Sequence, residues 1–131
     1  MIVLDTHVLV WWVSGSGRLS VRAKRAIDQS LRQGPAIVSA ITLLEIATAV
    51  RRGRLEFGLP LDQWLADLYA LSELQFEPVS AEIAQLAGSL EDKTPGDPAD
   101  RIIIATALTL RAELVTADER LRASPHVVAV W

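Results

Sequence analysis

Two acidic residues of this chain follow apolar segments in a pattern that could place them together. Asp5 comes directly after Met1–Leu4, and Asp118 follows Leu114–Thr116 after one intervening residue. Ligands of parallel α/β sheets bind beyond the carboxyl ends of the strands, so two neighbouring strands would bring both carboxylates to one edge. Taken alone, each aspartate is better explained as a turn former or helix cap.

Glu45 is harder to explain as a structural residue. It lies in Ile41–Val50, a segment that is apolar on most of its helical circumference and therefore predicts a buried helix. An ionised carboxylate in such a place needs a partner, because an unpaired buried charge is strongly unfavourable. An ion pair with Arg101 is one explanation, and a bound cation is the one we favour.

For Asp97 and Asp100, unlike Glu45, a structural role is the better explanation of each residue alone. The segment Asp97-Pro98-Ala99-Asp100 fits the N-cap and the first three positions of a helix, with proline at N1 and an acid in the first turn. Helix capping explains both residues when they are taken alone. Taken together with Asp5, Glu45 and Asp118, a carboxylate here could join a cluster at the sheet edge.

Such a cluster would suit a hard cation and phosphoryl chemistry. Neighbouring carboxylates repel one another unless a divalent ion neutralises them. The chain has no cysteine and two histidines, so oxygen ligands must dominate any metal site, which favours Mg²⁺ or Mn²⁺. These ions activate water and stabilise charge at a phosphodiester. The hydroxyls of Thr6 and Thr116 could orient carboxylates or water.

The elements that must position these residues are short and alternate in type. We expect strands near Met1–Leu4 and at the following ranges: 36–38, 76–79, 114–116 and 127–130. We expect helices over these ranges: 7–13, 21–33, 40–52, 61–74, 81–90, 102–111 and 117–121. Short apolar strands alternating with helices predict an α/β fold with a parallel sheet covered on both faces.

Length and composition fit a single folded domain. The chain has 131 residues, of which 50% are hydrophobic and 22% charged, and its formal net charge is −3. Total charge therefore does not indicate a strongly basic nucleic-acid binder. The N-terminus lacks the features of a signal peptide, and the apolar stretch Ala36–Val50 is interrupted by Glu45 and shorter than the ~20 residues of a membrane span. We expect a cytoplasmic protein.

Four segments spread over nearly the whole chain carry a family resemblance: Leu4–His7, Ser39–Ile46, Asp97–Ala105 and Leu114–Asp118. Their order and separations resemble those of the PIN domain, and more narrowly those of VapC-type toxins from bacterial and archaeal toxin–antitoxin pairs. Each segment is weakly specific by itself, whereas four in register are strongly specific.

The resemblance implies a PIN-like three-layer α/β/α fold with a central, mainly parallel sheet, formed by residues 1–131 as one PIN domain. It implies a Mg²⁺- or Mn²⁺-dependent endoribonuclease acting on structured RNA such as tRNA or rRNA. It assigns the catalytic and metal-ligating roles to Asp5, Glu45, Asp100 and Asp118, and makes Asp97 a cap or secondary ligand. It also implies a homodimer and inhibition by a cognate antitoxin.

Basic residues offer further candidates. Arg51, Arg52 and Arg54 could contact RNA phosphates, or they could simply complement the dipole at a helix C-terminus. Arg101, beside Asp100, could hold Glu45 or touch a scissile phosphate. His7 opens a helix next to Asp5, and we expect it to pack or hydrogen bond rather than act as an acid or base.

Two other functions fit the same acidic residues. The first is a non-catalytic PIN-like binding module whose acidic pocket receives a basic side chain from a partner. The second is a metal-dependent phosphatase or DNA nuclease of similar fold. Metal binding separates the binding module from the enzymes, and a comparison of substrates separates the enzymes from one another.

Overall fold

The computed structural model describes all residues from Met1 to Trp131. The strands are β1 (Ile2–Leu4), β2 (Ala36–Ser39), β3 (Leu74–Glu77), β4 (Glu113–Val115) and β5 (Ala129–Val130). The helices are α1 (Thr6–Ser14), α2 (Val21–Leu31), α3 (Ala40–Arg51), α4 (Leu61–Tyr69), α5 (Ala81–Ser89), α6 (Pro98–Leu110) and α7 (Glu119–Arg122). None of these helices has the length and apolarity needed to cross a membrane.

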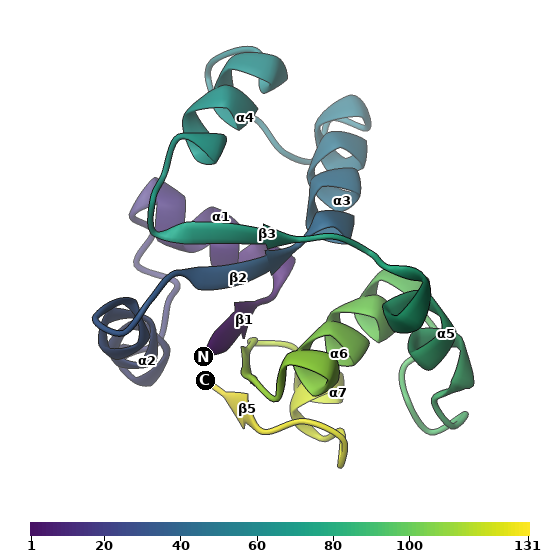
Figure 1. Cartoon of the computed structure of the whole chain (residues 1–131). Coiled ribbons are helices and arrows are strands. Elements are labelled where there is room, and N and C mark those ends of the chain that lie inside the picture. Colours follow the sequence, from purple (N-terminus) through teal and green to yellow (C-terminus); the bar gives the residue numbers. More distant parts are fainter.

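The five strands form one parallel sheet in the order β3-β2-β1-β4-β5 (Figure 1). β1 is central, with β2 on one side and β4 on the other, so the chain reverses its direction of winding between β1 and β4. The predicted α/β architecture with a parallel sheet is confirmed. In such sheets, the crevice outside the strand ends at this reversal is the usual ligand site.

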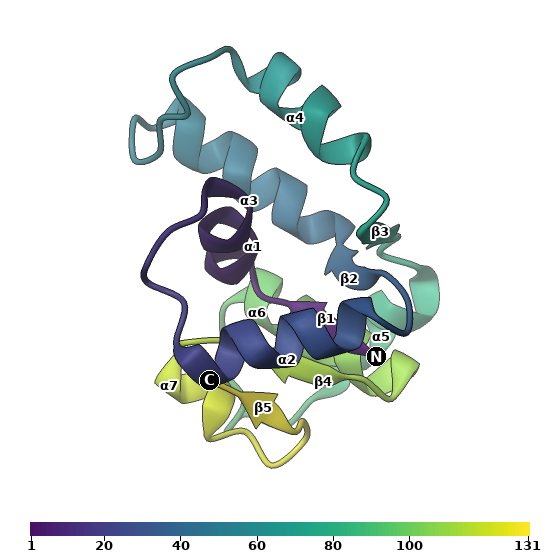
Figure 2. The same cartoon turned by 90° about the vertical axis from the view of Figure 1, so that its left-hand side faces the viewer.

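Alternating side chains of β1 build a core on each face of the sheet. Ile2 and Leu4 belong to the larger apolar cluster, which includes residues of α1, α2 and α4. Val3 belongs to a second cluster with residues of α6 and α7. Because successive side chains of a strand point to opposite faces, this apolar strand needs cover on both sides. Figure 2 shows α1 and α2 on one side of the strands and α6 on the other.

Serine or aspartate side chains begin six of the helices. Each accepts a hydrogen bond from a backbone N–H of the first turn: Asp5, Ser20, Ser39, Ser80, Asp97 and Asp118. Such caps satisfy N–H groups that have no partner inside the helix. Three of the candidate site residues are thus helix caps at strand or loop ends, which fixes the positions of their carboxylates.

The region between α4 and β3 corrects the sequence prediction. We expected a helix over 61–74 and a strand over 76–79, but α4 ends at Tyr69 and β3 runs from Leu74 to Glu77. The carbonyl of Glu73 accepts a 2.8 Å hydrogen bond from the Ala36 N–H, and β3 pairs with β2 from Leu74 onward. Pairing with the sheet therefore overrides the local helical preference of this segment.

The expectation that α3 is buried all round is wrong. Only Thr42 and Ile46 of this helix are buried, and Leu44 is 62% exposed. α3 lies at the edge of the sheet, where it contacts α1 and α6 (Figure 1). Glu45 is therefore half-buried and faces a cleft rather than a closed core.

Candidate active site

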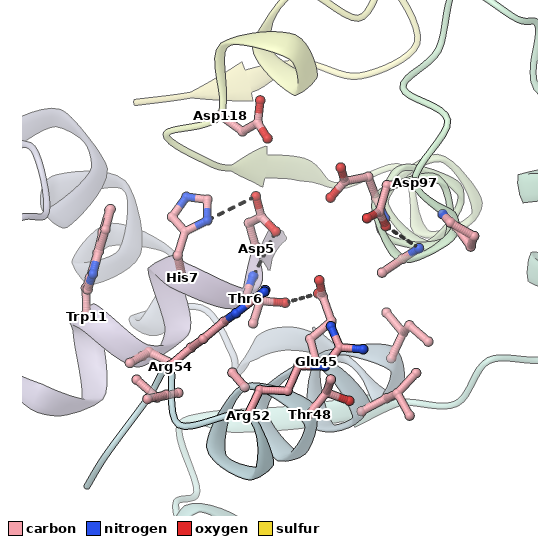
Figure 3. A pocket seen from close by; sticks show the side chains of 18 of the residues that line it. Asp5, Thr6, His7, Trp11, Glu45, Thr48, Arg52, Arg54, Asp97 and Asp118 are labelled. Carbon is pink, nitrogen blue, oxygen red and sulfur yellow. Dashed lines mark hydrogen bonds and ion pairs between the residues drawn. The ribbon is translucent and has the colours of Figure 1, made fainter.

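An open cleft of about 780 Å³ lies where β1 and β4 end and α1, α3 and α6 begin. All five acidic residues singled out in the sequence line it: Asp5, Glu45, Asp97, Asp100 and Asp118. Figure 3 shows Asp5, Glu45, Asp97 and Asp118 around one open space. The structure thus places residues from four separate segments of the chain at one edge of the sheet.

Asp5 is the most deeply buried of these acids. It follows β1, is only 4% exposed, and accepts hydrogen bonds through both oxygens. Oδ1 accepts from the Thr6 N–H at 2.8 Å, and Oδ2 accepts from the Thr116 hydroxyl at 2.6 Å. Thr116 Oγ1 in turn accepts from the Asp118 N–H at 3.1 Å, so this buried threonine connects the two strand ends.

His7 also lies between the segments that follow β1 and β4. Its Nε2 accepts a 3.1 Å hydrogen bond from the Ala117 N–H, so the proton of a neutral ring lies on Nδ1. Nδ1 is 3.6 Å from Asp5 Oδ2, and the ring packs against Trp11 with 4.9 Å between centroids (Figure 3). These contacts fit the predicted packing and hydrogen-bonding role.

Glu45 faces the cleft from α3. Its Oε1 accepts a hydrogen bond from the Thr6 hydroxyl, which also lies 3.0 Å from the Thr42 hydroxyl. Burial raises the pKa of Glu45, the Thr6 hydrogen bond opposes this shift, and the charges of Asp5 and Asp97 add to it. Thr6 therefore orients Glu45, and Thr116 orients Asp5, as expected for residues that position carboxylates.

Arg101 has a different role from the two that we expected. Its guanidinium does not reach Glu45 and does not line the cleft. It donates to the carbonyls of Ala87 at 2.9 Å, of Leu90, and of Thr94 and Pro95 at 3.5 Å each. Arg101 thus pins the loop that leads to the first turn of α6.

Asp97 and Asp100 share the first turn of α6 but differ in environment. Asp97 Oδ1 caps the helix by accepting from the N–H groups of Ala99 at 2.8 Å and Asp100 at 3.2 Å. Burial raises the pKa of Asp100 to about 7, helped by the charges of Asp5, Asp97, Asp118 and Glu45. Burial and the charges of the cluster therefore oppose the ionisation of Asp100 together.

Arg120 was not among the site residues that we predicted. Its Nη2 lies 3.1 Å from Asp118 Oδ2 and 3.5 Å from Asp100 Oδ2, and the residue lines the cleft. Hydrogen bonds from Arg120 lower the pKa of Asp118. Arg120 is the one arginine paired with the cluster, and its place two residues after Asp118 was the signal that could have revealed it.

Two of the three arginines predicted to contact RNA line the cleft, and the third does not. Arg52 and Arg54 line the cleft near the end of α3 (Figure 3), whereas Arg51 does not. All three are exposed and make no ion pair with an acidic side chain. Arg52 and Arg54 are therefore free to meet an anion that enters the cleft.

The carboxylates of the cleft are suitable ligands for a hard divalent cation, but they lie too far apart in this structure to bind one ion together. No three acidic or histidine side chains converge closely enough to hold an ion. Every ligand candidate is a carboxylate oxygen, the preferred donor for Mg²⁺ and Mn²⁺. Five carboxylates line the cleft with one paired arginine. Burial raises the pKa of Asp100, and the charges of the neighbouring carboxylates add to this shift.

Comparison with known proteins agrees with this geometry. The model of the PIN domain family matches residues 2–126. The chain belongs to the PIN-domain family. This PIN domain is 36% identical to the protein named ribonuclease VapC22 of Mycobacterium tuberculosis (strain ATCC 25618 / H37Rv), over 99% of this chain and 98% of that one.

Solved structures of similar fold also cover almost all of this PIN domain. A toxin–antitoxin complex from Klebsiella pneumoniae matches with a TM-score of 0.63 and 27% identity, over 98% of this chain and 96% of that one. VapBC2 from Rickettsia felis, bound to a promoter DNA fragment, matches with a TM-score of 0.72 and 20% identity, over 98% and 97%. The second match bears on the fold alone.

Proposed function

We propose that this PIN domain is a VapC-type toxin, a divalent-metal-dependent endoribonuclease that cleaves structured cellular RNA such as tRNA or rRNA. The observation that carries the proposal is that four carboxylates from separate elements line one open cleft: Asp5, Glu45, Asp100 and Asp118. The similarity to ribonuclease VapC22 over nearly the whole chain supports the same conclusion.

In this proposal, the four carboxylates would hold Mg²⁺ or Mn²⁺. The bound ion would supply Lewis acidity and lower the pKa of water near a phosphodiester. Thr116 and Thr6 keep Asp5 and Glu45 in fixed orientations, so little reorganisation is needed when an ion or substrate arrives. Asp97 positions Asp100 by capping α6.

Arg120 would contribute positive charge before a cation binds, and Arg52 and Arg54 would contribute it when RNA binds. Without a cation, Arg120 neutralises part of the charge of Asp100 and Asp118. A divalent ion between these carboxylates would compete with its guanidinium. Arg52 and Arg54, exposed at the rim, would contact phosphates without reading the base sequence.

Partner proteins follow from the same assignment. The similar structure from Klebsiella pneumoniae is a toxin–antitoxin complex. We therefore assign to this chain a cognate antitoxin as its inhibitor, and a homodimer as its active form, acting in the cytoplasm. Affinity capture of the tagged chain from its own host, followed by identification of the bound protein, tests the antitoxin. Mass measurement of the chain alone tests the homodimer.

The direct test is metal-dependent cleavage of RNA. Purified, antitoxin-free protein is incubated with total cellular RNA in Mn²⁺ or in chelator, alongside Asp5→Asn. Discrete fragments that require the metal and vanish in the variant are expected. Equal cleavage by both proteins would refute the site, and cleavage of single-stranded DNA or small phosphate esters in preference to RNA would refute the substrate.

A binding module is the second candidate, and one observation favours it. The acidic cleft already receives a basic side chain, Arg120, from its own chain. An arginine or lysine from a partner protein could occupy the same place. Absence of Mn²⁺ binding at millimolar concentration would favour this module over the nuclease.

A further inference from the structure

Basic residues outnumber acidic residues in one segment of this acidic chain. Between Thr6 and Leu44 lie five basic residues and one acidic residue, a local net charge of +4 in a chain whose net charge is −3. The five are Arg18, Arg22, Lys24, Arg25 and Arg32, and all of them are exposed. Local segregation of this kind builds a positive potential that total charge conceals.

Three of these arginines form one line, two of them on α2 and the third, Arg32, at its C-cap. Arg22, Arg25, Gln29 and Arg32 are spaced at i, i+3, i+7 and i+10, which places them on one face of a helix. We call Arg22, Arg25 and Arg32 the α2 stripe. The opposite face of α2 packs against the sheet through the buried residues Ala23 and Ile27.

The arginines of the α2 stripe lack the ion pairs that are typical of a solvent-facing helix surface without a binding role. Such faces usually alternate charges, so that acids and bases pair at i+3 or i+4. Asp28 is the single acid of α2, and no arginine of the stripe forms an ion pair with any acidic side chain. The guanidinium groups are therefore available to an external anion.

Arg18 and Trp11 connect the α2 stripe to the acidic cleft. The guanidinium of Arg18 lies 5.8 Å from the centroid of the Trp11 ring, and Trp11 lines the cleft beside His7. α2 begins at the end of the sheet where the strands finish and runs back toward the N-terminus of the chain (Figure 2). Positive charge thus extends from the rim of the cleft along α2.

We propose that the α2 stripe binds the sugar–phosphate backbone of the RNA as it leaves the cleft. This inference rests on the proposed ribonuclease function and names a surface that holds the substrate. The 11 residues of α2 span about 16 Å, enough for several consecutive phosphates. Arginine suits the task because its planar fork donates two hydrogen bonds to one phosphate.

The test compares two triple variants with the same net charge. Arg22→Gln/Arg25→Gln/Arg32→Gln removes the stripe, and Lys93→Gln/Arg111→Gln/Arg122→Gln removes three exposed charges elsewhere. Both are made in the Asp5→Asn background, so that RNA is bound without being cut. Binding of a fluorescein-labelled mixed-sequence RNA of about 20 nucleotides is measured by anisotropy between 50 and 200 mM salt, and folding is checked by thermal unfolding.

We expect the stripe variant to bind this RNA at least tenfold more weakly than the control variant at 50 mM salt. Because each contacted phosphate contributes about 0.7 to the slope of log K against log salt for single strands, the slope should fall by about 2. Equal affinity and slope in the two triple variants would overturn the proposal. So would loss of binding to a poly-glutamate peptide with unchanged RNA binding, which would assign the stripe to an acidic protein.

The parent protein, assayed in parallel for metal-dependent RNA cleavage, separates this inference from the proposed function. Cleavage by the parent together with equal RNA binding by the two triple variants would refute the stripe and leave the ribonuclease intact. Absence of cleavage together with weaker binding by the stripe variant would refute the ribonuclease, while the stripe would stand as an RNA-binding surface.

Discussion

The hydroxyl of Thr116 donates a 2.6 Å hydrogen bond to Asp5 Oδ2 and thereby joins the ends of β4 and β1. Both residues are buried, and they come from opposite ends of the chain. The same hydroxyl accepts from the N–H of Asp118. One side chain thus fixes the relative positions of two carboxylates that we propose as metal ligands.

Thr116→Val is expected to weaken metal binding. The substitution keeps the shape of the side chain but leaves Asp5 Oδ2 without its donor, which should lower Mn²⁺ affinity by about 10- to 100-fold. It should also reduce the free energy of unfolding by about 1–3 kcal/mol. Calorimetric titration with Mn²⁺ and chemical denaturation measure the two effects.

Thr106→Val is the matched control for this substitution. Thr106 is also buried, but its hydroxyl donates only to the Ile102 carbonyl of its own helix, at 2.7 Å. We expect Mn²⁺ binding by Thr106→Val to equal that of the parent. Equal Mn²⁺ affinity in both threonine variants would contradict the role given to Thr116.

Asp100→Asn is expected to stabilise the metal-free protein at alkaline pH. The raised pKa means that folded protein retains a proton on Asp100 between pH 3.8 and about 7, while unfolded protein has released it. The free energy of unfolding should therefore fall as the pH rises through this window. Asparagine removes the penalty, so the variant should exceed the parent by on the order of 2 kcal/mol at pH 8.

Urea denaturation from pH 4 to 8 without metal measures this difference. Near pH 4, where the parent carboxyl is protonated, parent and Asp100→Asn should converge. Asp67→Asn, at an exposed position of α4, serves as control and should follow the parent at every pH. A difference between Asp100→Asn and the parent that did not change with pH would show that the cluster does not oppose the ionisation of Asp100.

Arg120→Ala is expected to strengthen metal binding. Its guanidinium pairs with Asp100 and Asp118, which an ion would need as ligands, so removing it should raise Mn²⁺ affinity several-fold at low salt. Arg122→Ala removes the same charge from the same helix, where the side chain is exposed and unpaired, and should leave affinity unchanged. Weaker or equal Mn²⁺ binding by Arg120→Ala would refute this competition.

Arg101→Met is expected to destabilise the loop before α6. Four carbonyls would lose a charged donor, a change that should reduce the free energy of unfolding by about 3 kcal/mol. Amide hydrogen exchange should rise most between Leu90 and Asp97. If exchange rose no more there than in Arg122→Met, the pinning role of Arg101 would be wrong.

Much of the fold could be predicted because local patterns and tertiary pairing agree. The apolar run of β1 forms the strand that we expected, and α2, α3 and α5 begin at the residues that we predicted. The end of α4 could not be predicted, because the carbonyl of Glu73 is engaged by Ala36 of a distant strand. Nothing near Glu73 in the sequence reveals that pairing.

The candidate site could also be predicted only in part. The acids could be found because a carboxylate after a strand, or within an apolar helix, is conspicuous by itself. The roles of Arg101 and Arg120 were not predicted. The position of Arg120 two residues after Asp118 made it a candidate, but adjacency in sequence does not say where a long side chain reaches. Arg101 extends back to the loop after α5, whereas Arg120 turns toward the cleft.

A Mn²⁺ titration of the antitoxin-free protein by calorimetry tests the proposed metal site most directly. We expect binding by the parent, loss of at least 100-fold in affinity for Asp5→Asn and Asp118→Asn, and near-parental affinity for Asp97→Ser, which retains a helix cap. Absence of Mn²⁺ binding by the parent at millimolar concentration, or parental affinity in Asp5→Asn, would contradict it.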